Sequence, residues 1–153
     1  SLRDAESILG QVMAVEDKVI TRAGVEEIFG HPPRQAAKEL FSYVAKKDVP
    51  QALSLIQRLS DEGHDMQYVA KLLMRYFRAA LFLKTDEGLE EYLGEEFLPD
   101  EVECIKENLG LMAQDHIARG VEIMFDNLQR FKRTPIPQLP LEIAVVAMAN
   151  LSL

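Results

Sequence analysis

Histidine, cysteine and carboxylate side chains are the residues of this 153-residue chain that could take part in catalysis or bind a metal. The three histidines, His31, His64 and His116, are far apart, and none has a second ligand at the short spacing typical of a zinc site. We therefore expect structural or surface histidines and no metal site. Cys104 has no adjacent base that would lower its pKa, so we expect it to be a small, half-buried apolar residue.

The carboxylates are concentrated in one segment. Residues 86–107 contain ten acidic side chains and a single basic one, Lys106. The pattern indicates exposed carboxylates on short helices, which argues against a catalytic acid/base pair. Two interpretations remain open: a solvated acidic face, or a docking surface for a basic partner. For the second, the candidate residues are Glu90, Glu91, Glu95 and Glu96.

Composition excludes several classes of protein and site. The net charge is −8, and no broad basic surface is present that would bind nucleic acid non-specifically. Neither G-x-x-x-x-G-K-[ST] nor G-x-G-x-x-G occurs, so we expect no nucleotide-phosphate loop and no catalytic residues. No apolar run is long enough to span a membrane. One cysteine fits a reducing cytoplasm, and the missing Met start and signal peptide lead us to expect a piece of a longer chain.

Apolar residues make up 48% of the chain and recur at helical spacing, and no alternating run predicts a strand. The sequence therefore predicts an all-α bundle. The segment 66–83 is apolar almost all round and should be its central helix. Gly30 and the following His-Pro-Pro end one helical segment and mark a domain boundary. The remaining expected helices cover residues 2–12, 21–29, 37–44, 50–59, 115–131 and 141–151, with two short acidic helices on either side of Pro99.

The last two predicted helices carry the candidate residues for an interface between proteins. In 115–131 the apolar residues follow a 4-3-4-3 spacing, and 141–151 has Glu142 as its only charge. Such apolar faces must be buried, either in the core of this bundle or against a neighbouring protein. Both alternatives stay open for Ile117, Val121, Met124, Leu128, Phe131, Ile143 and Val146.

Several short motifs follow one another in an informative order. The chain opens with Ser-Leu-Arg-Asp-Ala at 1–5, continues with Val-Ile-Thr at 19–21 and Val-Glu-Glu-Ile-Phe-Gly at 25–30, has Gly-His-Asp at 63–65, and closes with Leu-Pro-Leu-Glu-Ile at 139–143. Together they resemble the gamma/tau subunit of bacterial DNA polymerase III, the motor of the sliding-clamp loader. The resemblance implies an all-α helical bundle like the clamp-loader collar at 31–153, preceded at 1–30 by a helical remnant of the AAA+ lid.

The resemblance also implies a role for individual parts. Arg3 matches the family's nucleotide-sensing arginine, whose guanidinium would meet the phosphates of ATP in the whole protein. ATP with Mg²⁺ and a zinc module are expected in an upstream domain, so this chain should have no cofactor and no enzyme activity of its own. Its expected partners are the delta and delta-prime subunits and further gamma/tau copies. Primer-template DNA and the sliding clamp would be contacted only through the whole complex, in the cytoplasm and without a membrane.

A second function stays open beside the clamp-loader collar. The chain could act as a stand-alone acidic helical adaptor that binds a basic protein through residues 86–107. Such binding would weaken strongly with added salt.

Overall fold

The structure, a computed structural model, describes residues 32–151, and within that range it contains helices and turns but no strand. The predicted all-α fold class is therefore confirmed. By their contacts, the residues from Pro33 to Leu153 form one compact unit, separate from Ser1–Pro32. The predicted lid remnant at 1–30 lies outside the described residues, and the assignment of either unit to a named domain stays a prediction.

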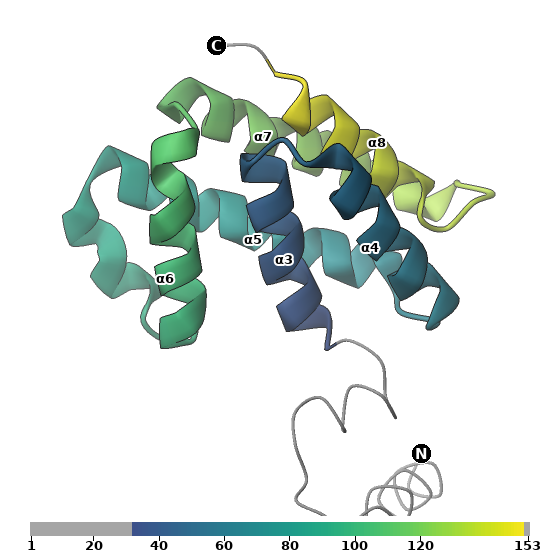
Figure 1. Ribbon diagram of the computed structural model, residues 1–153, viewed down its shortest axis with the longest axis horizontal. Helices are drawn as coiled ribbons and strands as arrows, with labels where there is room; N and C mark the ends of the chain where they lie inside the picture. Colours follow the sequence, from purple (N-terminus) through teal and green to yellow (C-terminus); the bar gives the residue numbers. More distant parts are fainter. Residues whose placement is uncertain (1–31, 152–153) are drawn as a thin grey trace, which may run out of the picture. The chain divides into compact units, whose positions relative to one another are not determined.

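Short connections link the helices, which pack as a bundle (Figure 1). Among the helices between residues 32 and 151, none combines the length with the apolar composition that crossing a bilayer requires. In chain order the elements are α3 (Pro33–Ala45), α4 (Val49–Asp61), α5 (Met66–Thr85), the 3-10 helix η1 (Glu87–Leu93), α6 (Pro99–Asn108), the 3-10 helix η2 (Leu109–Leu111), α7 (Gln114–Leu128), the 3-10 helix η3 (Gln129–Lys132) and α8 (Leu139–Ala149).

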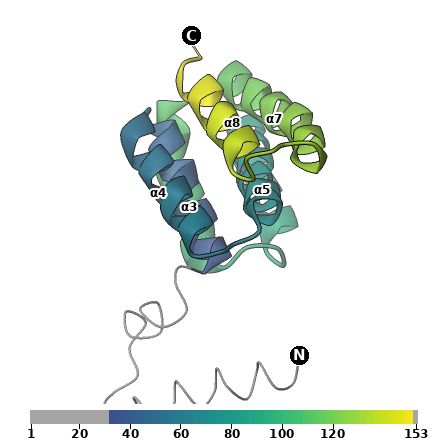
Figure 2. The same cartoon turned by 90° about the vertical axis from the view of Figure 1, so that its right-hand side faces the viewer.

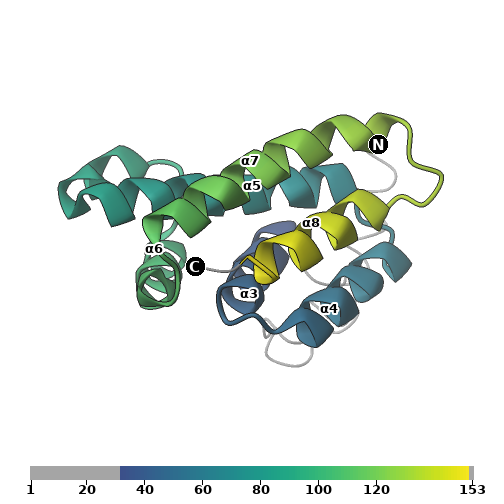
Figure 3. The same ribbon diagram turned by 90° about the horizontal axis from the view of Figure 1, so that it is seen from above.

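Helix α5 is the central element, as the sequence predicts. The side chain of Asp65 begins it by accepting hydrogen bonds from the backbone N–H groups of Gln67 and Tyr68, at 3.0 and 3.3 Å. The helix then packs against α3 and α7, and α7 runs beside it in Figure 3. Its polar side chains, Arg75 and Arg78 among them, lie at the surface. The helix is therefore buried on most sides, which explains its long apolar sequence.

Aromatic rings join α5 to its neighbours at the middle of the core. The rings of Phe41 on α3 and Phe77 on α5 lie 5.1 Å apart in an edge-to-face arrangement. Phe41 also contacts the ring of Tyr76 at 5.7 Å, and Tyr76 contacts Phe97 at 5.3 Å. These contacts link α3, α5 and the segment before α6 into one cluster.

Helix α4 extends slightly beyond the predicted 50–59 at both ends. Asp48 caps its start by accepting a hydrogen bond from the N–H of Gln51, and Pro50 lies in the first turn, where its missing N–H costs little. Gly63 follows the end with a φ of +83°, a conformation that favours glycine. The chain can therefore reverse at this point and pass directly into α5. Figure 2 shows α4 beside α3; α8 packs against both of these helices, and α5 packs against α3.

Helix α7 ends earlier than predicted. Its α-helical part stops at Leu128, and residues Gln129–Lys132 continue as the tighter 3-10 helix η3. The last turn of a helix commonly tightens in this way, and the prolines at 135 and 137 prevent the helix from continuing. Helix α8 likewise begins at Leu139 rather than Leu141 and ends at Ala149.

Helices α5 and α7 approach each other closely at Gly120. A Cβ atom placed on Gly120 would lie 3.1 Å from Cδ1 of Phe77 and 3.6 Å from Sδ of Met148. Both neighbours belong to the buried core, so neither can move aside freely. The absent side chain at this position therefore sets the spacing of α5, α7 and α8.

We expect the substitution Gly120→Leu to destabilise the domain by about 1–3 kcal/mol, because the added atoms overpack the core against Phe77. The matched control is Gly110→Leu, since a Cβ at Gly110 meets nothing within 4 Å. Urea unfolding followed by circular dichroism measures both. Equal stabilities of the two variants would contradict the close approach.

Candidate functional site

Helix α8 has apolar side chains on two opposite faces. One face, with Leu141, Ala144, Val145 and Met148, is fully buried in the core of the domain. On the other face Ile143 is 41% exposed, and Val146 and Ala147 are half-buried. The sequence left open whether this helix packs inside or against a neighbour, and the structure buries one face and leaves the other uncovered. We call this surface the α8 patch; its apolar residues are Leu53 from α4 with Leu139, Ile143, Val146 and Ala147, and Glu142 also lines it.

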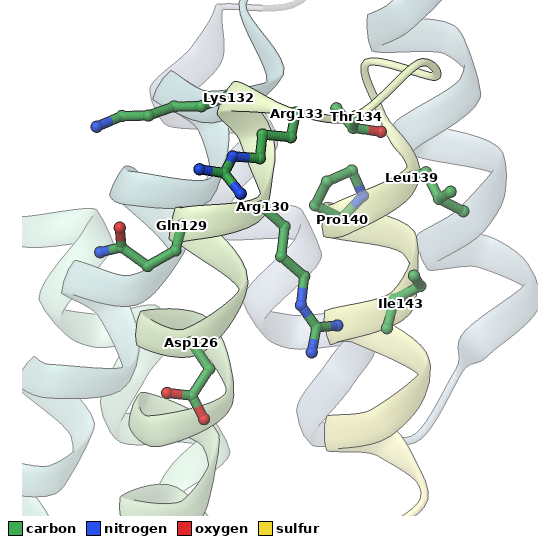
Figure 4. Close-up of a pocket in the computed structure, with 9 residues that line it drawn as sticks. All are labelled: Asp126, Gln129, Arg130, Lys132, Arg133, Thr134, Leu139, Pro140 and Ile143. Atoms are coloured by element: carbon green, nitrogen blue, oxygen red, sulfur yellow. The ribbon is translucent and has the colours of Figure 1, made fainter.

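A hollow lies beside the α8 patch, between the end of α7 and the start of α8 (Figure 4). Its apolar wall comes from α8 and includes Ile143, which it shares with the patch. Figure 4 shows the Arg130 side chain extending from the α7 side toward α8. We call it the α7–α8 hollow; it is lined by Asp126, Gln129, Arg130, Lys132, Arg133, Thr134, Leu139, Pro140 and Ile143.

The charge of the α7–α8 hollow is positive. Three basic side chains line it against a single carboxylate, Asp126. Within residues 32–151 none of Arg130, Lys132 and Arg133 forms an ion pair. Among the described residues, the guanidinium of Arg130 donates a hydrogen bond to Oδ1 of Asn127, at 3.4 Å. Sequence reasoning missed this site, although the basic run at 130–133 directly before a proline-rich segment was a usable signal.

The four acidic docking candidates differ in their surroundings. Glu90 pairs with Lys106 at 2.6 Å, and Glu96 lies 3.7 and 3.9 Å from Arg75 and Arg78. Glu91 and Glu95 are exposed, and neither forms an ion pair with any residue that the structure describes. Only these last two are thus free to meet a basic partner without breaking a bond within the domain. Their role as docking residues stays a prediction.

One carboxylate of the acidic segment is not exposed as the sequence pattern indicates. Glu101 on α6 is only 4% exposed. It accepts hydrogen bonds from the guanidinium of Arg34 on α3 and from the hydroxyl of Tyr76 on α5. It also accepts one from the backbone N–H of Leu98, at 2.8 Å, which caps α6. The prediction that these carboxylates are exposed is wrong for Glu101, because its partners Arg34 and Tyr76 are far away in the sequence.

These contacts lower the pKa of Glu101 and raise the pKa of Tyr76. Burial on its own would raise the pKa of Glu101, but the hydrogen bonds from Arg34, Tyr76 and Leu98 outweigh burial and hold that pKa below its usual range. Burial, together with the hydrogen bond to Glu101, raises the pKa of Tyr76 far above its usual value. At neutral pH the cluster therefore holds a charged carboxylate and a neutral phenol.

The apolar candidates on α7 mostly belong to the core. Ile117 and Met124 are 0% and 1% exposed, so for them the intramolecular alternative applies. Val121, Leu128 and Phe131 are partly buried and pack against the same core. The candidates on α8 lie differently, since Ile143 and Val146 belong to the α8 patch. An interface role is left mainly to α8, and it stays a prediction.

The remaining candidate residues do not form a site. His64 lies 3.0 Å from a Glu62 carboxylate oxygen, and the Nε2 atom of His116, which is buried, lies 3.1 Å from the carbonyl oxygen of Met148. Cys104 is half-buried as predicted, and burial raises its pKa. No metal-binding group of three or more His, Cys, Asp or Glu occurs in the described part of the chain. Arg3, the nucleotide-sensing candidate, lies outside it.

Two comparisons with known proteins agree on one family, and a third shows a similar fold. Residues 20–153 match the family described as DNA polymerase III subunits gamma and tau domain III. The chain is 27% identical to DNA polymerase III subunit tau of Bacillus subtilis (strain 168), over 99% of this chain and 26% of that protein. It therefore spans much less than the whole of this relative. The fold is similar to that of the Bacillus subtilis DNA clamp loader delta protein, with a TM-score of 0.69 and 17% identity over 86% of this chain and 41% of that one.

We expect Arg34→Met to destabilise the domain by about 1–2 kcal/mol at neutral pH, because it leaves a buried carboxylate with fewer hydrogen bonds; the half-exposed position of Arg34 keeps the loss small. The wild-type contribution of Glu101 is present above its unfolded pKa of about 4.3 and is lost as the pH falls through its lower folded pKa. Without Arg34 the folded pKa rises, so acid unfolding should begin at higher pH.

Urea unfolding between neutral and acid pH measures this shift. The matched control is Arg119→Met, which removes the partner of the exposed Glu122 at 2.8 Å and should change the acid limb little. An identical pH dependence for wild type and Arg34→Met would show that Glu101 does not depend on Arg34.

Proposed function

This chain belongs to the family of domain III of the DNA polymerase III gamma and tau subunits, and from that premise we propose that it serves DNA replication as the oligomerisation, or collar, domain of a clamp loader. In this role the domain binds neighbouring clamp-loader subunits and thereby holds their ATPase domains in a ring. The ring places the sliding clamp on primed DNA.

The observation that supports this proposal is the α8 patch. Contiguous exposed apolar surface typically marks a protein–protein contact. The opposite face of α8 is locked in the core by Leu141, Val145 and Met148, so the patch is formed before any partner binds. Binding to a preformed surface requires little ordering of the chain, and more of the energy of apolar burial is retained as affinity.

The proposed partners are the delta and delta-prime subunits and further gamma/tau copies. Primer-template DNA and the sliding clamp are reached only through the assembled complex, in the cytoplasm. The domain itself acts by binding and not by catalysis. ATP with Mg²⁺ and zinc belong to an upstream domain of the whole protein, and Arg3 is the residue of this chain that would sense the bound nucleotide there.

We expect Ile143→Asp, introduced into the complete gamma/tau subunit, to weaken assembly with the delta and delta-prime subunits by about tenfold or more, which corresponds to about 1.4 kcal/mol. An added charge at this position removes the isoleucine contact and must be stripped of water when the partner binds. Mass photometry of the mixed subunits over a concentration series measures the fraction assembled.

The matched control is Leu111→Asp, which places the same charge on η2, where the leucine is 50% exposed. Both variants should keep the wild-type melting temperature, because neither side chain is buried. The proposal fails if Ile143→Asp assembles as well as wild type, or if the control impairs assembly equally.

A further inference from the structure

Two charged surfaces lie at opposite ends of the domain. The α7–α8 hollow is at the end where α7 passes into α8, on the right of Figures 1 and 3. The other surface lies where η1 follows α5, on the left of both views, with α6 beside it. We call it the acidic end. The acidic end has five exposed glutamates that form no ion pair in the described part of the chain. They are Glu87, Glu91, Glu95, Glu103 and Glu107.

The acidic end also carries large exposed apolar side chains. Tyr92 on η1 is 68% exposed, and Leu98, which precedes α6, is 57% exposed. Tyr92 follows Glu91 directly and is three residues before Glu95, so two glutamates without an ion pair among residues 32–151 flank this aromatic residue in the sequence. Exposed tyrosines of this kind are common anchors in protein interfaces.

The α7–α8 hollow complements the acidic end in both respects. Its basic side chains, Arg130, Lys132 and Arg133, have no ion-pair partner among residues 32–151. Its wall on α8 offers Leu139 and Ile143 to an apolar or aromatic ring. A segment with a tyrosine between glutamates therefore matches the hollow in charge and in apolar surface.

The two surfaces cannot meet within one molecule, because the bundle separates them. We propose that the α7–α8 hollow of one copy of this chain binds the acidic end of a second copy, with Tyr92 seated against the apolar wall and Glu91 and Glu95 paired with the basic side chains. This contact rests on the proposed assembly function and refines it, since the hollow shares Leu139 and Ile143 with the α8 patch.

A contact between different ends of identical chains has a direction. Each copy that uses its hollow still offers its acidic end to the next, so copies associate head to tail and either close into a ring or continue as an open row. Charge pairing of this type mainly sets orientation and the rate of encounter. The association should therefore weaken as salt shortens the range of the charges.

A charge-swap experiment tests the contact. The first variant, Lys132→Glu with Arg133→Glu, reverses the charge of the hollow; the second, Glu91→Lys with Glu95→Lys, reverses the charge on either side of Tyr92. We expect each variant alone to self-associate at least about tenfold more weakly than wild type. Mixed, the two variants should associate again, because the acidic hollow of the first variant meets the lysines that flank Tyr92 in the second. Sedimentation velocity of the 153-residue chain, with one variant fluorescently labelled, measures this at about 0.03 M and about 0.5 M salt.

Two further variants control the experiment. Lys46→Glu with Lys71→Glu changes the net charge as much as the first variant but at exposed positions outside both surfaces, and it should associate like wild type. Tyr92→Ala should weaken association without changing its salt dependence. The proposal is overturned if wild type stays monomeric at low salt, if the mixture fails to associate, or if the control is as weak as the first variant.

The same variants separate this contact from other possibilities. If a single-stranded oligonucleotide binds wild type and not the Lys132→Glu, Arg133→Glu variant, while the mixture of swapped variants does not associate, the hollow binds phosphate and not a second copy. If the swapped variants fail to pair but Ile143→Asp still blocks assembly with the delta and delta-prime subunits, this inference fails alone. If Ile143→Asp assembles normally, the proposed function fails instead.

Discussion

The buried carboxylate of Glu101 is the interaction on which the arrangement of the acidic segment depends. Arg34 on α3, Tyr76 on α5 and the backbone N–H of Leu98 all donate to it. An ionised carboxylate can remain buried only when it is paired and hydrogen-bonded in this way. The cluster therefore ties α6 to α3 and α5, and it places the surrounding glutamates at the surface. Arg34 also donates to the carbonyl oxygen of Glu96, which holds the turn before α6.

The division of α8 into two apolar faces follows from the close packing around α5. Because Gly120 has no side chain, α7 approaches Phe77 closely, and Met148 of α8 lies beside the same point. Contacts with α7 and α4 then cover one face of α8 and leave Ile143 and Val146 uncovered. A rigid core and an unsatisfied apolar surface are thus two consequences of the same packing. This combination suits a domain whose proposed task is to hold other subunits in fixed positions.

Charge is distributed over the domain in a way that apolar packing does not require. Ion pairs neutralise part of the acidic segment, through Lys38, Arg75, Arg78 and Lys106. The exposed glutamates of the acidic end have no such partner in the described part of the chain. At the far end, Arg130, Lys132 and Arg133 surround a hollow with one carboxylate. Charges of opposite sign at opposite ends of the domain favour one orientation of a bound partner. An interface made only of apolar side chains favours no orientation in this way. The apolar patch and the charged ends can therefore contribute strength and orientation separately.

Local sequence determined the helices of this protein, and tertiary structure decided its surfaces. Helical spacing, the caps at Asp48 and Asp65 and the turn at Gly63 depend on neighbours within a few residues, so the all-α fold and the central place of α5 could be predicted. The burial of Glu101 could not, because its partners Arg34 and Tyr76 lie 67 and 25 residues away. For the same reason, apolar spacing alone did not separate Ile117, a core residue, from Ile143, an exposed one. A pattern shows that a side chain is apolar, whereas only packing shows which face of its helix is already covered.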